Sequence, residues 1–202
     1  MKQLHLTIAT RNPHKTREIA EILGRDFIVQ DLAGRGDIPD VAETGSTFDE
    51  NARLKAVGVS ERVAGVVLAD DSGLEVEALA GAPGVYSARY AGEQATDREK
   101  VTKLLHELRR ADPEKRNRAA QFRCVIAIAR DGECLAVFSG QVNGTIVDEP
   151  RGGGGFGYDP VFLPEGFTQT FAQLPGTTKN KISHRARALT AALPLFERLA
   201  DG

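Results

Sequence analysis

The sequence predicts an α/β fold, because runs of apolar residues typical of buried strands alternate with helical patterns. Residues 4–9 form a first apolar run, and Ile19, Ile22 and Leu23 then share one face of a predicted helix. A second run, at 66–69, follows another amphipathic helix. Two longer runs, 120–129 and 135–142, flank Asp131-Gly132, which predicts a hairpin. Both are apolar on both faces in places, so we expect central strands that helices cover.

The bulk composition indicates one domain, or one domain with two lobes. The chain has 202 residues, enough to bury a substantial core. Its formal net charge of −2 argues against a nucleic-acid binder driven by bulk positive charge. No stretch is apolar and long enough to span a membrane. The first residues lack the apolar core of a signal peptide, so a cytoplasmic location is expected.

The two cysteines are not expected to form a disulfide. A two-residue turn at Asp131-Gly132 would place Cys124 opposite Ser139 and Cys134 opposite Ala129. Neither cysteine has the spacing of a metal ligand. Both are predicted to be small core residues.

Two adjacent carboxylates, Asp70 and Asp71, directly follow the apolar run 66–69. Neighbouring strand residues point to opposite faces, so one of them can hold a metal or activate water while the other braces the loop. Ser72-Gly73 then predicts a turn. The alternative is an ordinary strand that ends in an acidic turn, and this stretch by itself favours neither.

The first helix is predicted to start with Asn12 as N-cap and Pro13 in its first position, and to end at Gly24. Lys15 then lies beside exposed backbone N–H groups, where a positive charge is unfavourable. A bound phosphate would resolve this conflict, although a solvated lysine would also cost little. The glycines of a Walker A loop are missing.

A second helix is predicted from the capping box Thr47–Glu50, after a strand at 27–32 and a loop at 34–43. Lys55 lies at the edge of the apolar face of this helix, so it either extends to the rim or reaches an anion in a cleft. Glu43, Lys55 and Asp71 could therefore converge at one end of a sheet.

The second half of the chain contains a glycine-rich loop and a cationic segment. The loop, 151–160, is costly to order and carries Phe156, an aromatic ring without an obvious core partner that could stack on a flat ligand. Ser87–Tyr90 is predicted to open a short helix, and the capping box Thr96–Glu99 another. Ser183 is the predicted N-cap of the last helix, with His184 and Arg185 in its first turn and a kink or break at Pro194.

These residues together are typical of phosphoryl chemistry on a nucleotide with Mg²⁺. Glu43 and Asp71 could hold a divalent cation, and Lys15 and Lys55 a polyphosphate. The cluster of Lys179, His184 and Arg185 could recognise the polar edge of a ring, on which Phe156 would stack.

At this level the sequence resembles the inosine triphosphate pyrophosphatase family, also called the Ham1 or non-canonical purine NTP pyrophosphatase family. The segments that carry the resemblance are ATRNPHK at 9–15, ETGSTF at 43–48, ADDSGL at 69–74, GAPGVYSARY at 81–90, GFGYDP at 155–160, and Lys179-Asn180 with SHR at 183–185. The resemblance implies a long twisted mixed sheet flanked by helices, two lobes with a central cleft, and a homodimer. It implies hydrolysis of ITP, dITP and XTP to monophosphate and pyrophosphate.

The roles that follow from the resemblance are hypotheses about single residues. Glu43 and Asp71 would hold Mg²⁺, with Asp71 and Lys15 as the catalytic residues, Asp71 deprotonating water and Asp70 a possible supporting ligand. Cationic donors at Arg185 would favour a 6-oxo purine over adenine. The residues expected to bind substrate are Thr10, Arg11, Asn12, Pro13, His14, Lys15, Lys55, Ser72, Phe156, Gly157, Tyr158, Asp159, Lys179, His184 and Arg185.

Two alternatives stay open. A Maf-like pyrophosphatase would act on modified pyrimidines or canonical nucleotides, whereas the segment 179–185 favours purines. A nucleotide-sensing module could share the same residues without catalysis, but it would have no need for a carboxylate that activates water.

Overall fold

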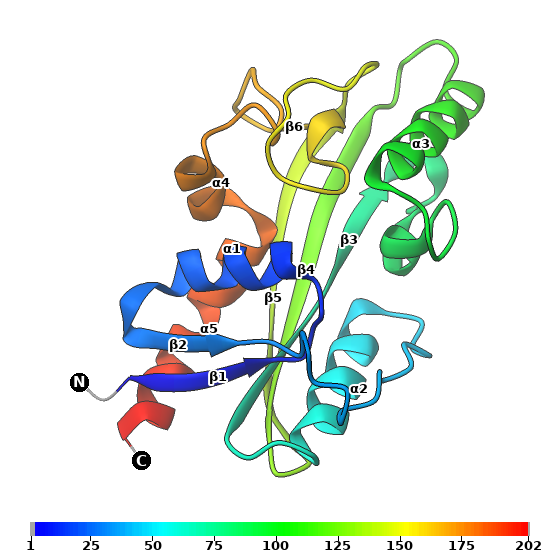
Figure 1. Ribbon diagram of the computed structural model, residues 1–202. Helices are drawn as coiled ribbons and strands as arrows, with labels where there is room; N and C mark the ends of the chain where they lie inside the picture. The colour runs from blue at the N-terminus through cyan, green and yellow to red at the C-terminus, as the bar shows by residue number, and fades with distance from the viewer. Residues whose placement is uncertain (1–2, 202) are drawn as a thin grey trace. The chain divides into compact units, whose positions relative to one another are not determined.

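The computed structural model describes residues 3–201, which form a six-stranded mixed sheet with helices around it (Figure 1). The strand order is β2-β1-β3-β4-β5-β6. β1 pairs in parallel with both β2 and β3, whereas β5 and β6 pair antiparallel. The strands are β1 (Leu4–Ile8), β2 (Phe27–Gln30), β3 (Val66–Val76), β4 (Ala119–Arg130), β5 (Glu133–Ile146) and β6 (Phe162–Pro164).

Five α-helices and four short 3₁₀ helices complete the described chain, and the α/β prediction is confirmed. The α-helices are α1 (Pro13–Leu23), α2 (Phe48–Ser60), α3 (Asp97–Ala111), α4 (Gly176–Ile182) and α5 (His184–Asp201). The 3₁₀ helices are η1 (Gly24–Asp26), η2 (Glu77–Leu79), η3 (Gly84–Arg89) and η4 (Asp159–Val161). None of the described helices is long and apolar enough to cross a membrane.

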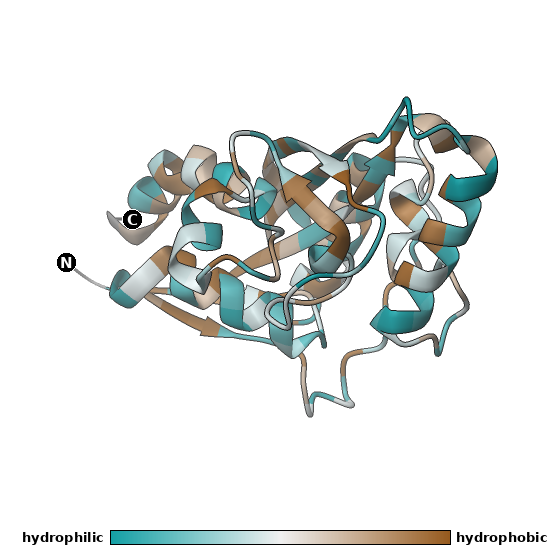
Figure 2. Cartoon of the chain, turned by 90° about the horizontal axis from the view of Figure 1, so that it is seen from above, coloured by the Kyte–Doolittle hydropathy of each residue, from teal (hydrophilic) through white to brown (hydrophobic). Residues whose placement is uncertain are grey.

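The chain divides into two compact units, each with its own hydrophobic core. Unit 1 consists of 1–71, 124–140 and 184–202, and unit 2 of 72–123 and 141–183. In unit 1, α1 and α5 pack with β1, and the core includes an edge-to-face contact between Phe27 and Phe196 at 5.5 Å. In unit 2 the core gathers Phe122, Phe162 and Phe171 against α3. Figure 2 shows brown, hydrophobic residues along the strands and a mixture of brown and teal on the helices.

The predicted starts of α1, α2 and α3 are confirmed, whereas the short helix predicted to open at Ser87 begins at Gly84 as η3. The side chain of Asn12 accepts hydrogen bonds from the backbone N–H groups of His14 and Lys15, and Gly24 caps the end of α1. Complete capping boxes start α2 at Thr47 and α3 at Thr96. These signals involve residues that are at most four positions apart, so the sequence carries them directly.

The turn predicted at Ser72-Gly73 is wrong, because β3 continues through the carboxylates to Val76. Gly73 has a different task there. A Cβ atom on it would lie 2.4 Å from Ser87 Oγ and 2.5 Å from the carbonyl oxygen of Gly84. The glycine is therefore needed because η3 packs closely on the strand, not because the chain reverses.

Two further expectations are corrected at the C-terminal end. Residues 176–182 were predicted only as a segment before the last helix. They form the separate helix α4, and Ser183 is the capping residue that follows it. Pro194 does not split the last helix: α5 runs without interruption from His184 to Asp201. An internal proline costs about 3 kcal/mol in a helix. Burial of Leu189, Ala192 and Phe196 in the core of unit 1 offsets that cost.

The hairpin prediction is confirmed. β4 and β5 are joined at Asp131 and Gly132, which have φ values of 52° and 82°. Two positive φ angles are the signature of the tight turn that matches the twist of a hairpin. Cys124 and Cys134 are both free in the described chain, as the register predicted.

Candidate active site

Strand β3 directs its two carboxylates to opposite faces of the strand. Asp70 contacts Lys15 of α1 and Arg185 of α5, whereas Asp71 contacts Lys55 of α2. This division follows from the alternation of side chains along a strand. The sequence predicted it correctly, and the contacts show which carboxylate goes to which helix.

Asp70 is completely buried and lies at the centre of a network of charged side chains. Its Oδ1 lies 2.7 Å from Lys15 Nζ, and its Oδ2 lies 2.8 Å from Arg185 Nε and 3.1 Å from Cys124 Sγ. Burial by itself would raise the pKa of Asp70, but the charges of Arg185 and Lys15 outweigh it and hold that pKa well below its usual value. Arg185 also pairs with Glu18 of α1. Asp70 is therefore the counter-charge that Lys15 and Arg185 share.

Cys124 donates its S–H group to this network. Burial and the neighbouring Asp70 carboxylate raise the pKa of the thiol well above its usual value, so the thiol stays protonated and can donate to Asp70 Oδ2. The prediction of a small core residue holds for its burial. Its polar contact was missed, because nothing in the sequence near Cys124 points to Asp70.

Asp71 and Glu43 meet at a single ammonium group. Lys55 Nζ lies 2.7 Å from Asp71 Oδ1 and 2.9 Å from Glu43 Oε1, so the predicted convergence of these three residues is present. Within the described chain, the other oxygen of Asp71, Oδ2, is buried and has no hydrogen-bond partner. Burial raises the pKa of Asp71 above its usual value, against the lowering effect of Lys55.

Lys15 and Lys55 approach the same backbone atom. Their Nζ atoms lie 3.3 Å and 3.0 Å from the carbonyl oxygen of Asp70. One strand position therefore collects two ammonium groups from two different helices, directly beside the unpartnered oxygen of Asp71. Lys15 reaches this point from the first turn of α1, and Lys55 from the inner face of α2. The arrangement can attract a polyanion while it offers a carboxylate oxygen to water or to a cation.

The residues around Asp71 fit a cation that is shared with phosphate oxygens. A buried carboxylate oxygen without a partner is costly, and Asp71 Oδ2 is such an atom. Among residues 3–201, no group of three or more acidic, histidine or cysteine side chains is gathered to hold a metal. Glu43 and Asp71 are a pair, which is the number of carboxylates that Mg²⁺ commonly takes when a substrate supplies further oxygens.

The residues of the loop before α1 make contacts within the protein. Arg11 donates to the carbonyl oxygens of Arg35 and Ile38 and pairs with Asp40, so its guanidinium holds the following loop. Thr10 Oγ1 accepts from the N–H of Asn12. Pro13 occupies the first position of α1, and His14 lies exposed in the first turn.

In unit 2, the predicted base-binding residues lie together. Lys179 Nζ lies 2.6 Å from Asp159 Oδ2 and 5.1 Å from the centre of the Phe156 ring. Both members of this ion pair are almost completely buried. The N–H of Phe156 donates to the same Asp159 oxygen at 2.9 Å. A Cβ atom on Gly155 would lie 1.9 Å from that oxygen, so the loop needs a glycine where it passes over Asp159.

The predicted cationic segment 179–185 spans two helices, because α4 ends at Ile182 and α5 begins at His184. Lys179 lies in α4 and contacts Asp159 and Phe156 of unit 2. Arg185 and the buried His184 begin α5 in unit 1, where Arg185 contacts Asp70 and Glu18. Lys179 and Arg185 are close in sequence, so a single cationic cluster was predicted. The extended backbone of Ser183 separates the two helices that carry them. Ser72 is the residue of β3 that follows Asp71.

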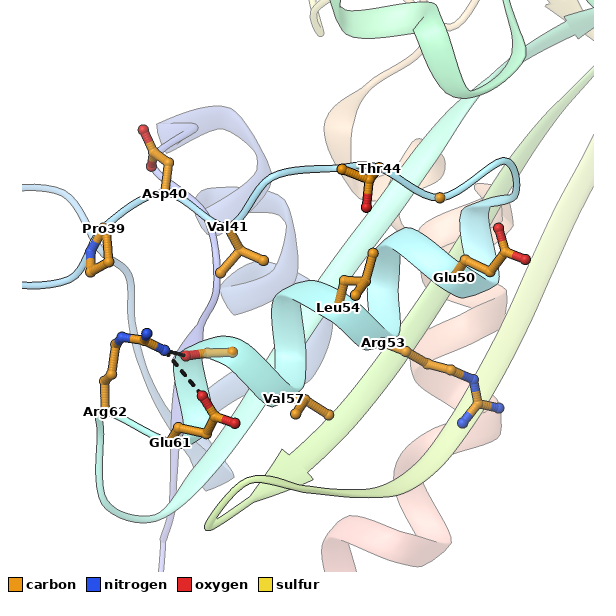
Figure 3. A pocket seen from close by; sticks show the side chains of 12 residues that line it. Pro39, Asp40, Val41, Thr44, Glu50, Arg53, Leu54, Val57, Glu61 and Arg62 are labelled. Carbon is orange, nitrogen blue, oxygen red and sulfur yellow. Dashed lines mark hydrogen bonds and ion pairs between the residues drawn. The ribbon is translucent and has the colours of Figure 1, made fainter.

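A surface groove of about 830 Å³ lies beside α2 and is distinct from the carboxylate cluster (Figure 3). Leu54 and Val57 of α2 line it with Glu61, which follows the helix, and with Pro39, Asp40, Val41, Thr44 and Gly45 of the preceding loop. Lys55 is buried on another face of the same helix. The groove is therefore not where the predicted site residues meet.

The fold and this cluster define the chain as a mixed α/β protein with two lysines and two carboxylates gathered at the middle of one strand, an arrangement suited to a phosphorylated ligand. Comparison with known proteins agrees with that class. A family model described as "Ham1 family" matches residues 6–195. The chain therefore belongs to the Ham1 family.

Two relatives and one solved structure match this chain over almost their whole lengths. A protein of Bacillus licheniformis named dITP/XTP pyrophosphatase is 48% identical over 192 residues, 95% of this chain and 97% of that protein. One of Bacillus subtilis with the same name is 49% identical over 191 residues, 94% and 96% of the two chains. The structure of a HAM1 protein from Coxiella burnetii matches with a TM-score of 0.84 and 40% identity, covering 99% of this chain and all of that one.

Proposed function

We propose that this protein hydrolyses non-canonical purine nucleoside triphosphates, namely ITP, dITP and XTP, to the monophosphate and pyrophosphate. One observation carries the proposal. The ammonium groups of Lys15 and Lys55 meet at the carbonyl oxygen of Asp70, beside an oxygen of Asp71 that has no hydrogen-bond partner in the described chain. The names of the Bacillus relatives support the same reaction.

The two lysines would bind the triphosphate and balance the charge that develops on the pyrophosphate leaving group. Asp71 would take a proton from water, whose oxygen then attacks phosphorus while the anhydride bond to pyrophosphate breaks. A carboxylate whose pKa is raised by burial is a better base than an exposed one. Asp70 keeps Lys15 and Arg185 in place and takes no part in the proton transfer.

Mg²⁺ is the proposed cofactor, held by Glu43 and Asp71. When bound, it would neutralise and orient phosphate oxygens. The role of this chain is to present the two carboxylates together, which the shared contact with Lys55 does.

Phe156 would stack on the purine, and Lys179, positioned by Asp159, would donate to it. Inosine and xanthine present an oxygen at C6, whereas adenine presents an amino group that would face a donor. A mispaired buried donor costs about 1–3 kcal/mol, which is roughly a tenfold to hundredfold discrimination. His184 and Arg185 stay in the proposal as residues that recognise the base, and Thr10, Asn12, Ser72, Gly157 and Tyr158 as substrate contacts.

The proposal is tested by pyrophosphate release from a panel of ITP, dITP, XTP, ATP, GTP and modified pyrimidine triphosphates, with and without Mg²⁺. We expect release from the first three to be at least about tenfold faster than from the others, and to require the metal. Turnover of pyrimidine or canonical nucleotides instead would indicate a Maf-like enzyme. Binding of ITP without turnover would indicate a sensing module.

Replacing Phe156 with alanine is expected to raise KM for ITP by about tenfold or more, because base–aromatic stacking contributes roughly 1–3 kcal/mol. The Phe156 ring is only half-buried, so the midpoint of thermal unfolding should change little. Steady-state kinetics and thermal unfolding of the same preparation measure both. An unchanged KM would remove Phe156 from the binding site.

Three coarser expectations belong to the same proposal. The two compact units would be lobes of one domain, 1–202, that serve one substrate. The free cysteines support a reducing, cytoplasmic compartment. A homodimer is expected from the family resemblance, and the exposed side chains of Ile28, Leu54 and Leu135 offer apolar surface for it. Light scattering at micromolar concentration tests the dimer.

A further inference from the structure

The loop that carries Phe156 is held by residues outside the predicted site. The N–H of Gly157, next to Phe156, donates to Asp97 Oδ2 at 2.7 Å. Asp97 is the first residue of α3, sixty positions earlier in the sequence. The hydroxyl of Tyr158, the following residue, donates to the backbone oxygen of Ser87 at 2.9 Å. Two consecutive loop residues are thus attached to two distant elements of unit 2.

Capping does not account for Asp97. The start of α3 already has a complete capping box, in which Thr96 accepts from the N–H of Glu99 and Glu99 accepts from Thr96. Asp97 directs one carboxylate oxygen to Lys100 at 2.7 Å and the other to the loop. A bond from a charged acceptor to a backbone N–H is stronger than a neutral one, so it can fix the position of a glycine that has no side chain to pack.

Ser87 is itself rigidly placed. It is buried in η3, where its Oγ accepts from the N–H of Leu74 at 3.0 Å and donates to the carbonyl oxygen of Gly84 at 2.6 Å. The absence of a Cβ on Gly73 allows this close approach. The backbone oxygen of Ser87, which accepts from Tyr158, is therefore fixed relative to β3. The buried hydroxyl of Tyr158 in this way holds the loop at a defined position relative to the strand.

We propose that Asp97 and Ser87 are positioning residues for base recognition, which hold the glycine loop so that Phe156 stays over Lys179. Neither residue touches the substrate in this arrangement. The two bonds are made by the backbone N–H of Gly157 and the side-chain hydroxyl of Tyr158, the two residues that directly follow Phe156. Loss of either bond lets the ring leave its place, while the phosphate-binding residues of unit 1 are untouched. The inference rests on the proposed function, since it assigns the two residues to the base end of the same substrate.

The test compares Asp97→Ala, Asp97→Asn and Tyr158→Phe with the wild-type protein. Asp97→Ala removes the acceptor, and Asp97→Asn removes the charge but keeps an oxygen for Gly157. We expect Asp97→Ala and Tyr158→Phe to raise KM for ITP about threefold to tenfold, which corresponds to the loss of one hydrogen bond. The value of kcat should stay within about twofold of the wild-type value. Asp97→Asn should restore a KM near the wild-type value. The preference for ITP over ATP should fall in Asp97→Ala and in Tyr158→Phe.

Lys100→Gln is the matched control, because it breaks the ion pair with Asp97 and leaves the bond to Gly157 intact. It should keep the wild-type KM. The inhibition constant of inorganic tripolyphosphate, which has no base, should be unchanged in every variant. An unchanged KM in folded Asp97→Ala, or an equal rise in the inhibition constant of tripolyphosphate, would overturn the inference. If the wild-type protein and Lys100→Gln both fail to hydrolyse ITP, that result contradicts the proposed function and is distinct from a failure of the positioning role of Asp97 and Ser87.

Discussion

Replacing Asp71 with asparagine is expected to lower kcat for ITP by about a hundredfold to ten-thousandfold, the usual contribution of a general base. Asparagine has nearly the same size but cannot take a proton from water. Lys55 keeps its contact with Glu43, so the fold should be retained. Pyrophosphate release at saturating ITP measures the loss, and circular dichroism of the same sample checks the fold.

Asp148→Asn is the matched control for this experiment. Asp148 is a partly exposed carboxylate in unit 2 that pairs with Lys115, so its loss removes a carboxylate of the same kind without touching Asp71. Its kcat should equal that of the wild-type protein. Full activity in Asp71→Asn would exclude this carboxylate as the general base.

Replacing Asp70 with asparagine is expected to lower the free energy of unfolding by about 3–5 kcal/mol, the cost of removing one member of a buried ion pair. Asp70 is completely enclosed, and its removal leaves Lys15 and Arg185 without their shared counter-charge. Urea unfolding followed by circular dichroism measures the change. Asp148→Asn, which breaks an exposed pair, should lose no more than about 1 kcal/mol. A similar small loss for Asp70→Asn would contradict the role of Asp70 as a structural counter-charge.

The pH dependence of the same variant gives an independent check. The folded protein lowers the pKa of Asp70 from its value in the unfolded chain. Its stabilising contribution is therefore complete above about pH 4 and is lost as the pH falls through the lower, folded pKa. The difference in unfolding free energy between the wild-type protein and Asp70→Asn should narrow as the pH is lowered below about 4. A constant difference would show that the charge of Asp70 is not what stabilises the fold.

Much of the candidate site could be expected from the sequence, but not the partner of each charge. The meeting of Glu43, Lys55 and Asp71 followed from a helix, a strand and a loop that are consecutive in the chain. The contact of Arg185 with Asp70, 115 positions away, could not be expected from residues that are close in sequence. Glu18 was missed altogether, although its place three residues after Lys15 puts both on one face of α1.

The sequence by itself determined the elements and their ends, because caps, tight turns and strand alternation act between residues a few positions apart. It also determined that Asp70 and Asp71 face opposite ways. Only the tertiary structure decided that Asp70 is the structural counter-charge and Asp71 the carboxylate with a free oxygen. The reason is that the pKa of a carboxyl group depends on burial and on the charges that folding brings near it, and here those charges come from three different helices, two of which are more than fifty positions away.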